Sequence, residues 1–321
     1  MSVRLTVRRE EWLAHVRRTA EAYGPGLVPV VKGNGYGFGR ALLHETAATL
    51  SDAVCVGSVH EHRDAPTDRT VVALTPTLDP PASTSTDLVC TVGSPAHVRP
   101  LDGRGGRVLL KLASSMRRYG ATPDELPALR RAVDAAGLEV LGHSLHLPLA
   151  GGDDDRLREV EAWLRHLEVD VPLWLSHLTP DSFAELSRRH PDRRFRIRVG
   201  TAIWHGVPRA DFLHLDAEVL SIRTVRRGEV AGYHATPVPF DGTLVAVGAG
   251  TAHGVAPLDH EDPARRSPFH FGRRRLTMLE RPHMHTTLLV VAPDQPTPEV
   301  GDRVDLQRPL VSTLADELVW T

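Results

Sequence analysis

The stretch LVPVVKGNGYGFGR, residues 27–40, decides which fold this chain is expected to adopt. It opens with apolar and β-branched residues, and after Lys32 it turns into a segment with glycine at every second position. A short, continuously apolar run bounded by glycines is typical of a parallel strand that is buried on both faces. We therefore expect Lys32 to project from the carboxyl end of such a strand.

The same kind of run recurs along the first two thirds of the chain. Eight are found: LVPVV, AVCVG, TVVAL, LVCTV, RVLLKL, LEVLGH, VPLWL and FRIRV. Amphipathic helical patterns lie between several of them, clearest at residues 10–23, 126–136, 156–167 and 182–189. Strands alternating with helices eight times over about 200 residues predict a (β/α)8 barrel of the TIM type rather than an open sheet. The third and fourth connections are short and carry weak helix signals.

After Leu213 the pattern changes to alternating strands broken by glycine and proline. Such alternation predicts an antiparallel β domain. We expect a barrel domain at residues 1–213 and a β domain at 214–321, and leave open that the first few residues pair with the β domain.

Composition excludes several functions. The chain has 321 residues, 41% hydrophobic and 24% charged, with a formal net charge of -2. This balance gives no electrostatic footprint for nucleic acid. No apolar run is long enough for a membrane helix, the N-terminal segment is too polar for a secretory core, and Cys55 and Cys90 cannot form a disulfide framework. We therefore expect a cytoplasmic protein.

Lysine usage singles out two positions. Only Lys32 and Lys111 are lysines among the 38 basic residues, so arginine serves almost everywhere else. A primary amine can lose its proton and form covalent adducts, whereas a guanidinium stays protonated. Nucleotide motifs do not explain the turn after Lys32, because Phe38 stands where a dinucleotide fingerprint needs glycine and no Gly-Lys-Ser/Thr is present.

The segment VVKGNGYGFG, residues 30–39, resembles the pyridoxal phosphate attachment motif of alanine racemases, which join a barrel to a C-terminal β domain. The resemblance implies that Lys32 binds the cofactor covalently and that Tyr36 reaches its phosphate. KLASSMRRYG, residues 111–120, resembles a segment in which a lysine, here Lys111, becomes carbamylated and braces an arginine, here Arg118, that binds the substrate carboxylate.

Three further segments resemble the family in the same order. SLHLPL places His146 where the family carries a histidine near the cofactor ring, so the resemblance implies that role for His146. RIRVGTAIWHG, residues 196–206, resembles the family strand that sets an arginine, here Arg198, against the pyridine nitrogen. The resemblance also implies that the N–H groups of Gly200 and Thr201 face the phosphate. GYHATPV carries the second base, here Tyr233, which in the family reaches the partner subunit's site. The resemblance therefore implies a homodimer with shared active sites, and two bases, Lys32 and Tyr233.

The chain also departs from the family pattern. Met284, whose backbone amide meets the substrate carboxylate in the family, is followed by His285 instead of aspartate, and Ala249 stands near the place of an expected tyrosine. Arg117 replaces a typical glycine. The phosphate-binding tyrosine near the C-terminus is missing, and so is an asparagine and serine pair that Ser176, Thr179 or Ser182 could replace.

Three functions remain open. The first is an alanine racemase that interconverts L- and D-alanine, or a relative acting on another small amino acid. The second is a different barrel-type pyridoxal phosphate enzyme, a decarboxylase or a D-amino-acid lyase. The third is a non-catalytic pyridoxal phosphate carrier, against which Tyr233 counts. We expect no metal, because the imidazole pairs His60/His62 and His283/His285 lack an identifiable third ligand.

Overall fold

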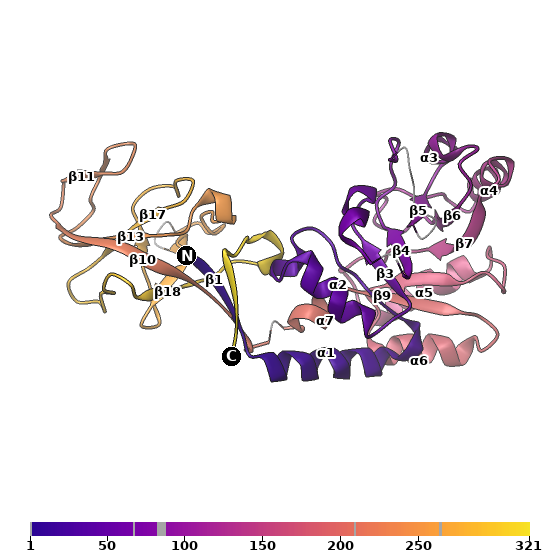
Figure 1. Cartoon of the computed structure of the whole chain (residues 1–321), viewed down its shortest axis with the longest axis horizontal. Coiled ribbons are helices and arrows are strands. Elements are labelled where there is room, and N and C mark those ends of the chain that lie inside the picture. The colour runs from indigo at the N-terminus through magenta and orange to yellow at the C-terminus, as the bar shows by residue number, and fades with distance from the viewer. Residues whose placement is uncertain (1, 67, 82–87, 209, 263–264) are drawn as a thin grey trace. The chain divides into compact units, whose positions relative to one another are not determined.

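The chain divides into two compact units in its computed structural model, which describes residues 2–66, 68–81, 88–208, 210–262 and 265–321 (Figure 1). The barrel unit comprises residues 13–35 and 39–207. The β unit comprises residues 1–12, 36–38 and 208–321. Each unit is described by itself.

The barrel unit contains eight parallel strands in the order β2-β9-β8-β7-β6-β5-β4-β3. The strands are β2 (Leu27–Pro29), β3 (Ala53–Val56), β4 (Thr70–Ala73), β5 (Leu88–Val92), β6 (Arg107–Lys111), β7 (Glu139–Ser144), β8 (Leu173–Ser176) and β9 (Phe195–Val199). A parallel bridge between Val30 and Cys55 joins the two ends of this order. The predicted barrel, with its eight apolar runs, is confirmed.

Burial on both faces explains why these runs are continuously apolar. Every residue of β3 and of β5 is buried. Side chains from six strands meet in one interior cluster, which contains Val28, Cys55, Val72, Val89, Leu109 and Trp174. The barrel is therefore closed around a packed core, as in other folds of this type.

Helices cover the barrel unevenly. They are α1 (Arg9–Tyr23), α2 (Arg40–Ala48), α3 (Pro95–Val98), α4 (Leu126–Ala135), α5 (Asp153–Leu164), α6 (Pro180–Arg189) and α7 (Thr201–His205). The fourth connection, one of the two with a weak helix signal, contains only the single turn of α3. The third lies between β4 and β5, and its residues 82–87 lie outside the described residues. The second connection holds a 3-10 segment at Val59–Asp64. Helix α5 begins three residues earlier than predicted, because acidic residues suit a first turn and Asp155 accepts a hydrogen bond from the N–H of Gly152.

The β unit is built on one nine-stranded sheet, whose main path runs β15-β14-β18-β10-β13-β17-β16. Its strands are β1 (Val3–Val7), β10 (Leu213–Val225), β13 (Gly242–Val247), β14 (Phe269–Phe271), β15 (Arg274–Arg275), β16 (Thr277–Met278), β17 (Thr287–Val291), β18 (Arg303–Leu306) and β19 (Glu317–Trp320). The N-terminal strand β1 pairs antiparallel with β10 and parallel with β19. A separate ribbon of β11 (Val230–Ala231) and β12 (Thr236–Pro237) carries the Tyr233 turn.

The predicted C-terminal antiparallel β domain is thus confirmed, with the N-terminal strand added to its sheet. Within the described residues, no helix combines the length and the apolar character that crossing a membrane requires.

Candidate active site

Lys32 follows β2 at the carboxyl end of the barrel, where enzymes of this fold place their chemistry. Two hydrogen bonds fix the chain just before it. The N–H of Val31 donates to the carbonyl of Cys55 at 2.7 Å, and the indole of Trp204 donates to the carbonyl of Val30 at 2.8 Å. Because Trp204 is fully buried, it anchors the backbone from which Lys32 projects.

Glu61 organises the loop around Lys32. Its carboxylate accepts hydrogen bonds from the N–H groups of Gly57 at 2.7 Å and Gly33 at 3.2 Å. A Cβ added to Gly57 would lie 3.2 Å from the Cβ of Lys32, so the two loops approach closely only because residue 57 is glycine. Nothing in the sequence pattern marked Glu61, which stands between His60 and His62, the pair considered as metal ligands.

The electrostatics at Lys32 favour its reactive form. Partial burial lowers the pKa of its ammonium, and the nearby charges of Arg118 and Arg198 lower it further, while Glu61 opposes them. The side chain nevertheless stays exposed at the barrel mouth. A lysine with a lowered pKa and open access is suited to act as a nucleophile or a base.

Lys111 ends strand β6 and, unlike Lys32, is buried. Burial lowers the pKa of its ammonium to about 6, and the charges of Arg198 and Arg118 act in the same direction. The amine is therefore mostly neutral at pH 7. The scarcity of lysine was the one sequence signal for this position apart from the family resemblance.

Arg198 is a buried cation held by oxygen atoms on two other strands. Its Nε donates to the carbonyl of Leu175 at 3.0 Å, and its two terminal nitrogens donate to the hydroxyl of Ser144 at 2.9 Å and to the carbonyl of Leu145 at 2.7 Å. Burial lowers its pKa, but a guanidinium remains protonated. In the part of the chain that the structure describes, no carboxylate pairs with it, so the site holds an uncompensated positive charge.

His146 follows β7 and is neutral. Its Nδ1 lies 2.8 Å from the hydroxyl of Ser176, and its ring lies 4.7 Å from that of His177. Burial lowers the pKa of His146 to about 2, with Arg198 adding to the effect. The hydroxyl of Ser176, which was considered as a phosphate ligand, is therefore hydrogen-bonded to His146.

Arg118 and Arg117 lie in the loop after β6. Both side chains are exposed, and the guanidinium carbon of Arg118 lies 4.6 Å from the centre of the Tyr119 ring. Arg117 has a φ of 51°, the left-handed conformation that favours glycine. A glycine at this position would adopt the same conformation without the Cβ strain.

Gly200 and Thr201 stand where strand β9 passes into α7. Gly200 is the residue before the first turn, and Thr201 is the exposed first residue of the helix. The other hydroxyls weighed for a phosphate, Thr179 and Ser182, both donate to the carboxylate of Asp153. A carboxylate at that point disfavours an anion, so these two hydroxyls are poor phosphate ligands.

The remaining predicted site residues belong to the β unit. Tyr36 is buried, with a φ of 54° in the glycine-rich turn, and its contacts assign it to this unit. Tyr233 and Met284 are 82% and 67% exposed. The ring of Tyr233 stacks on that of His283, with centroids 4.0 Å apart. The structure therefore brings Lys32, Lys111, Arg118, His146 and Arg198 together in the barrel, and groups Tyr233 with His283 in the β unit.

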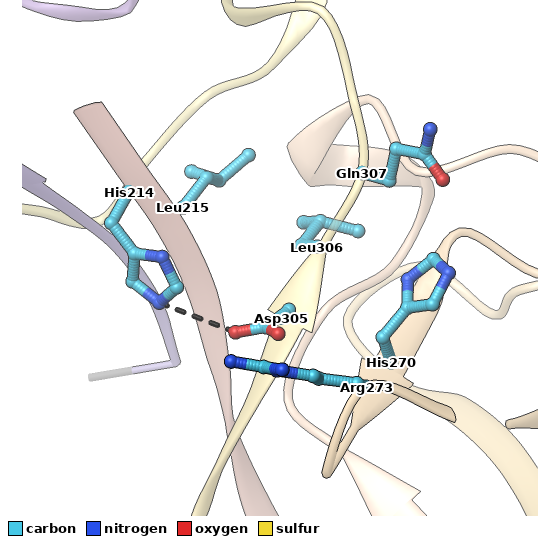
Figure 2. A pocket seen from close by; sticks show the side chains of 7 residues that line it. All are labelled: His214, Leu215, His270, Arg273, Asp305, Leu306 and Gln307. Carbon is cyan, nitrogen blue, oxygen red and sulfur yellow. Dashed lines mark ion pairs between the residues drawn. The ribbon is translucent and has the colours of Figure 1, made fainter. Parts of the chain in front are cut away.

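A cavity of about 410 Å³ lies within the β unit (Figure 2). Figure 2 shows His214 and His270 on either side of Asp305, and His214 lies 3.3 Å from that carboxylate. The lining residues are His214, Leu215, His270, Arg273, Asp305, Leu306 and Gln307. None of the predicted site residues is among them. Across the described ranges, no group of three or more His, Cys, Asp or Glu side chains could hold a metal ion.

Fold and site together define a two-unit barrel protein whose strand ends, among the described residues, bring lysine and arginine side chains close to the carboxylate of Glu61. A sequence model of the family "Alanine racemase, N-terminal domain" matches residues 8–208. Since this match covers more than half of the chain, the protein belongs to that family.

Individual relatives agree with this assignment. The chain is 28% identical over 215 residues to an alanine racemase of Laribacter hongkongensis, covering 62% of this chain and 56% of the relative. It is 26% identical over 263 residues to an alanine racemase of Mycobacterium tuberculosis, covering 71% of this chain and 67% of the relative. The first match thus spans less than two thirds of the relative's length.

Solved structures show the same fold over the whole chain. The alanine racemase of Bartonella henselae, which has covalently bound pyridoxal phosphate, matches with a TM-score of 0.76 at 16% identity and covers 100% of both chains. That of Corynebacterium glutamicum matches with a TM-score of 0.74 at 18% identity and covers 99% of each chain.

Proposed function

We propose that the protein is a pyridoxal phosphate-dependent alanine racemase that uses Lys32 and Tyr233 as its two bases. The observation that carries this proposal is the site at the barrel strand ends. There an exposed lysine with a lowered pKa stands beside the fixed, uncompensated cation Arg198. Family membership and the relatives named alanine racemase support the substrate.

The residues present fit the cofactor. Arg118, Arg198 and the carboxylate of Glu61 all act electrostatically on Lys32. Within the described residues these groups carry an excess of positive charge, which a phosphate and a substrate carboxylate would neutralise. The N–H groups of Gly200 and Thr201, at the start of a helix, would bind phosphate oxygens. When bound, pyridoxal phosphate supplies an electron sink that makes the α-proton of the amino acid acidic.

The chain's own groups then move and hold protons. For one enantiomer the neutral amine Nζ of Lys32 takes the α-proton while the hydroxyl of Tyr233 donates a proton from the opposite face. For the other enantiomer the phenolate of Tyr233 takes the α-proton and the ammonium of Lys32 donates one. Arg118 binds the substrate carboxylate through its planar fork, together with the backbone amide of Met284. Arg198, Tyr36 and His146 complete the cofactor site, with Arg198 as a donor that does not give up its proton.

Lys111 carries a carbamate in this proposal. A neutral amine reacts with carbon dioxide, and the lowered pKa of Lys111 makes it neutral at pH 7. The amine nitrogen bonds to the carbon of carbon dioxide and one proton is released to solvent. The product is an anion buried next to Arg198 and Arg118. The two guanidinium charges would stabilise this anion, and the anion would hold Arg118 in place.

We also propose a homodimer with shared active sites that works in the cytoplasm. Tyr233, 82% exposed, is not enclosed by its own unit, as expected of a side chain that completes the site of a partner subunit. The buried free thiols of Cys55 and Cys90 suit a reducing compartment.

The first experiment adds pyridoxal phosphate to the purified protein and records its visible spectrum before and after borohydride, alongside Lys32→Ala. We expect a band that borohydride abolishes and that the variant lacks. A wild-type protein without such a band would contradict the proposal. Deuterium exchange at the α-carbon of L- and D-alanine then separates an enzyme from a carrier, since a carrier would show the band without exchange.

A further inference from the structure

The turn that carries Tyr233 is built around the carboxylate of Glu280. This carboxylate accepts hydrogen bonds from the N–H of Tyr233 at 2.9 Å, from that of His234 at 3.4 Å and from the hydroxyl of Thr236 at 2.8 Å. Its side chain is only 5% exposed. Burial by itself raises the pKa of the Glu280 carboxyl, but the hydrogen bonds from His283, Thr236 and the two backbone N–H groups outweigh it and lower the pKa to about 2.

The same carboxylate fixes the ring on which Tyr233 rests. Nε2 of His283 lies 2.5 Å from the Glu280 carboxylate. Because an ionised carboxylate only accepts hydrogen bonds, Nε2 carries the proton. The backbone of His283 is also tied down, since its N–H donates to Thr286 and its carbonyl accepts from Thr251, both at 2.8 Å.

The phenol ring of Tyr233 lies flat on this fixed imidazole. The two ring centroids are 4.0 Å apart and the ring planes differ by 17°. The phenol hydroxyl has no hydrogen-bond partner within the described ranges, so the stack on His283 and the anchored backbone are the contacts that direct it.

Gly232 shows how closely the turn approaches Glu280. Its φ is +81°, and a Cβ at this position would lie 2.1 Å from the Glu280 carboxylate. The backbone before Tyr233 therefore has no room to move toward the carboxylate.

We propose that Glu280 and His283 are positioning residues for Tyr233, holding its hydroxyl in one direction while leaving it free to meet a substrate. This inference rests on the proposed role of Tyr233 as a base. Glu280 sets the backbone of the turn and the plane of the His283 ring, and His283 sets the plane of the phenol. In this proposal both residues act through Tyr233.

The kinetic test measures α-proton exchange from both alanine enantiomers for Glu280→Gln, His283→Phe and His283→Ala. We expect Glu280→Gln to slow exchange about tenfold or more for the enantiomer that Tyr233 deprotonates, through kcat with little change in KM, because a small misplacement of a catalytic group is costly. Exchange from the other enantiomer should stay within about twofold of wild type. His283→Phe keeps the stack and should retain more activity than His283→Ala.

The matched control is Asp241→Asn. Asp241 is an exposed carboxylate of the same unit that accepts one backbone hydrogen bond, from Arg227 at 2.7 Å. It should behave like wild type toward both enantiomers. Equal losses from both enantiomers in Glu280→Gln, or a loss as large in Asp241→Asn, would overturn the proposal.

A second readout does not depend on activity. The chain has four tyrosines, and their rings can be observed by NMR in protein labelled with 13C-tyrosine. The signal of the Tyr233 ring is the one that disappears in Tyr233→Phe. We expect Glu280→Gln and His283→Ala to move this signal toward that of an unstructured tyrosine, and an unchanged signal would contradict the positioning role. If wild-type protein exchanged the α-proton of neither enantiomer, the proposed function would be wrong. The Tyr233 ring signal would still show whether Glu280 and His283 position the ring.

Discussion

The guanidinium of Arg198 donates a 2.9 Å hydrogen bond to the hydroxyl of Ser144, although strand β8 lies between the strands of the two residues. Its Nε bonds the carbonyl of Leu175 on β8 itself. One buried side chain thus ties three neighbouring strands together at the end of the barrel where Lys32 projects. A cation fixed in this way is oriented before any ligand arrives.

Replacing Arg198 with methionine should destabilise the barrel. The change leaves three buried oxygen atoms without their donor, at about 1–3 kcal/mol for each, and the removal of a buried charge offsets part of that cost. We expect a net loss of about 2 kcal/mol in the free energy of unfolding, measured by urea denaturation. Ser144→Ala, which removes a single acceptor, should cost about 1 kcal/mol. Equal stability of wild type and Arg198→Met would show that Arg198 does not hold the strands.

Lys111 should make stability depend on pH in the neutral to alkaline range. The folded chain releases the Lys111 proton above a pKa of about 6, whereas the unfolded chain keeps it up to a pKa near 10.5. Since the unfolded state binds more protons between these values, the free energy of unfolding rises with pH across that window. In buffer free of carbon dioxide, Lys111→Met should therefore be more stable than wild type at pH 7, by about 1–3 kcal/mol, and the difference should shrink toward pH 10.

Bicarbonate provides the matching comparison for the proposed carbamate. It should stabilise wild type but not Lys111→Met when ionic strength is held constant with chloride. The native mass of wild type alone should rise by that of one carbon dioxide per subunit. A bicarbonate effect of the same size in both proteins would rule out the carbamate.

Arg117 offers a test of backbone strain. Its φ of 51° is unfavourable for a residue with a Cβ, by about 1–2 kcal/mol. Arg117→Gly removes this strain but adds freedom to the unfolded chain, so we expect a net gain of about 0.5–1 kcal/mol in thermal or urea unfolding. Arg117→Ala keeps the Cβ and should bring no such gain. A gain in the alanine variant would point to the charge of Arg117 and not to its backbone.

The barrel could be predicted from the sequence because each strand is a short apolar run set off by breakers, a local signal. The ends of the helices were harder to predict from the sequence. Acidic residues at 153–155 serve a first turn or a cap equally well, and only the contact of Asp155 with Gly152 shows that α5 begins at Asp153. The N-terminal strand was left open because its partners, β10 and β19, lie more than 200 residues away in the chain.

Some residues of the candidate site could likewise be predicted from the sequence and others could not. Lys32 and Lys111 were visible in the sequence, because lysine is rare in this chain and both end strand-like runs. Glu280 was not, since an ordinary glutamate gains its role from hydrogen bonds to a turn 47 residues earlier. His283 was considered as a metal ligand only because another histidine stands two positions on, whereas its contacts are with Glu280 and Tyr233.

Subunit mixing tests whether two chains share each site. We expect Lys32→Ala and Tyr233→Phe each to be inactive as homodimers toward the enantiomer that Tyr233 deprotonates. In a mixed dimer with shared sites, one site combines both lesions and the other is intact. Random mixing would then restore about one quarter of wild-type exchange from that enantiomer. If each site were formed by a single chain, every site would keep one of the two substitutions and mixing would restore no exchange. That result would contradict the shared site. It would not affect the role of Lys32, which the visible spectrum of Lys32→Ala tests separately.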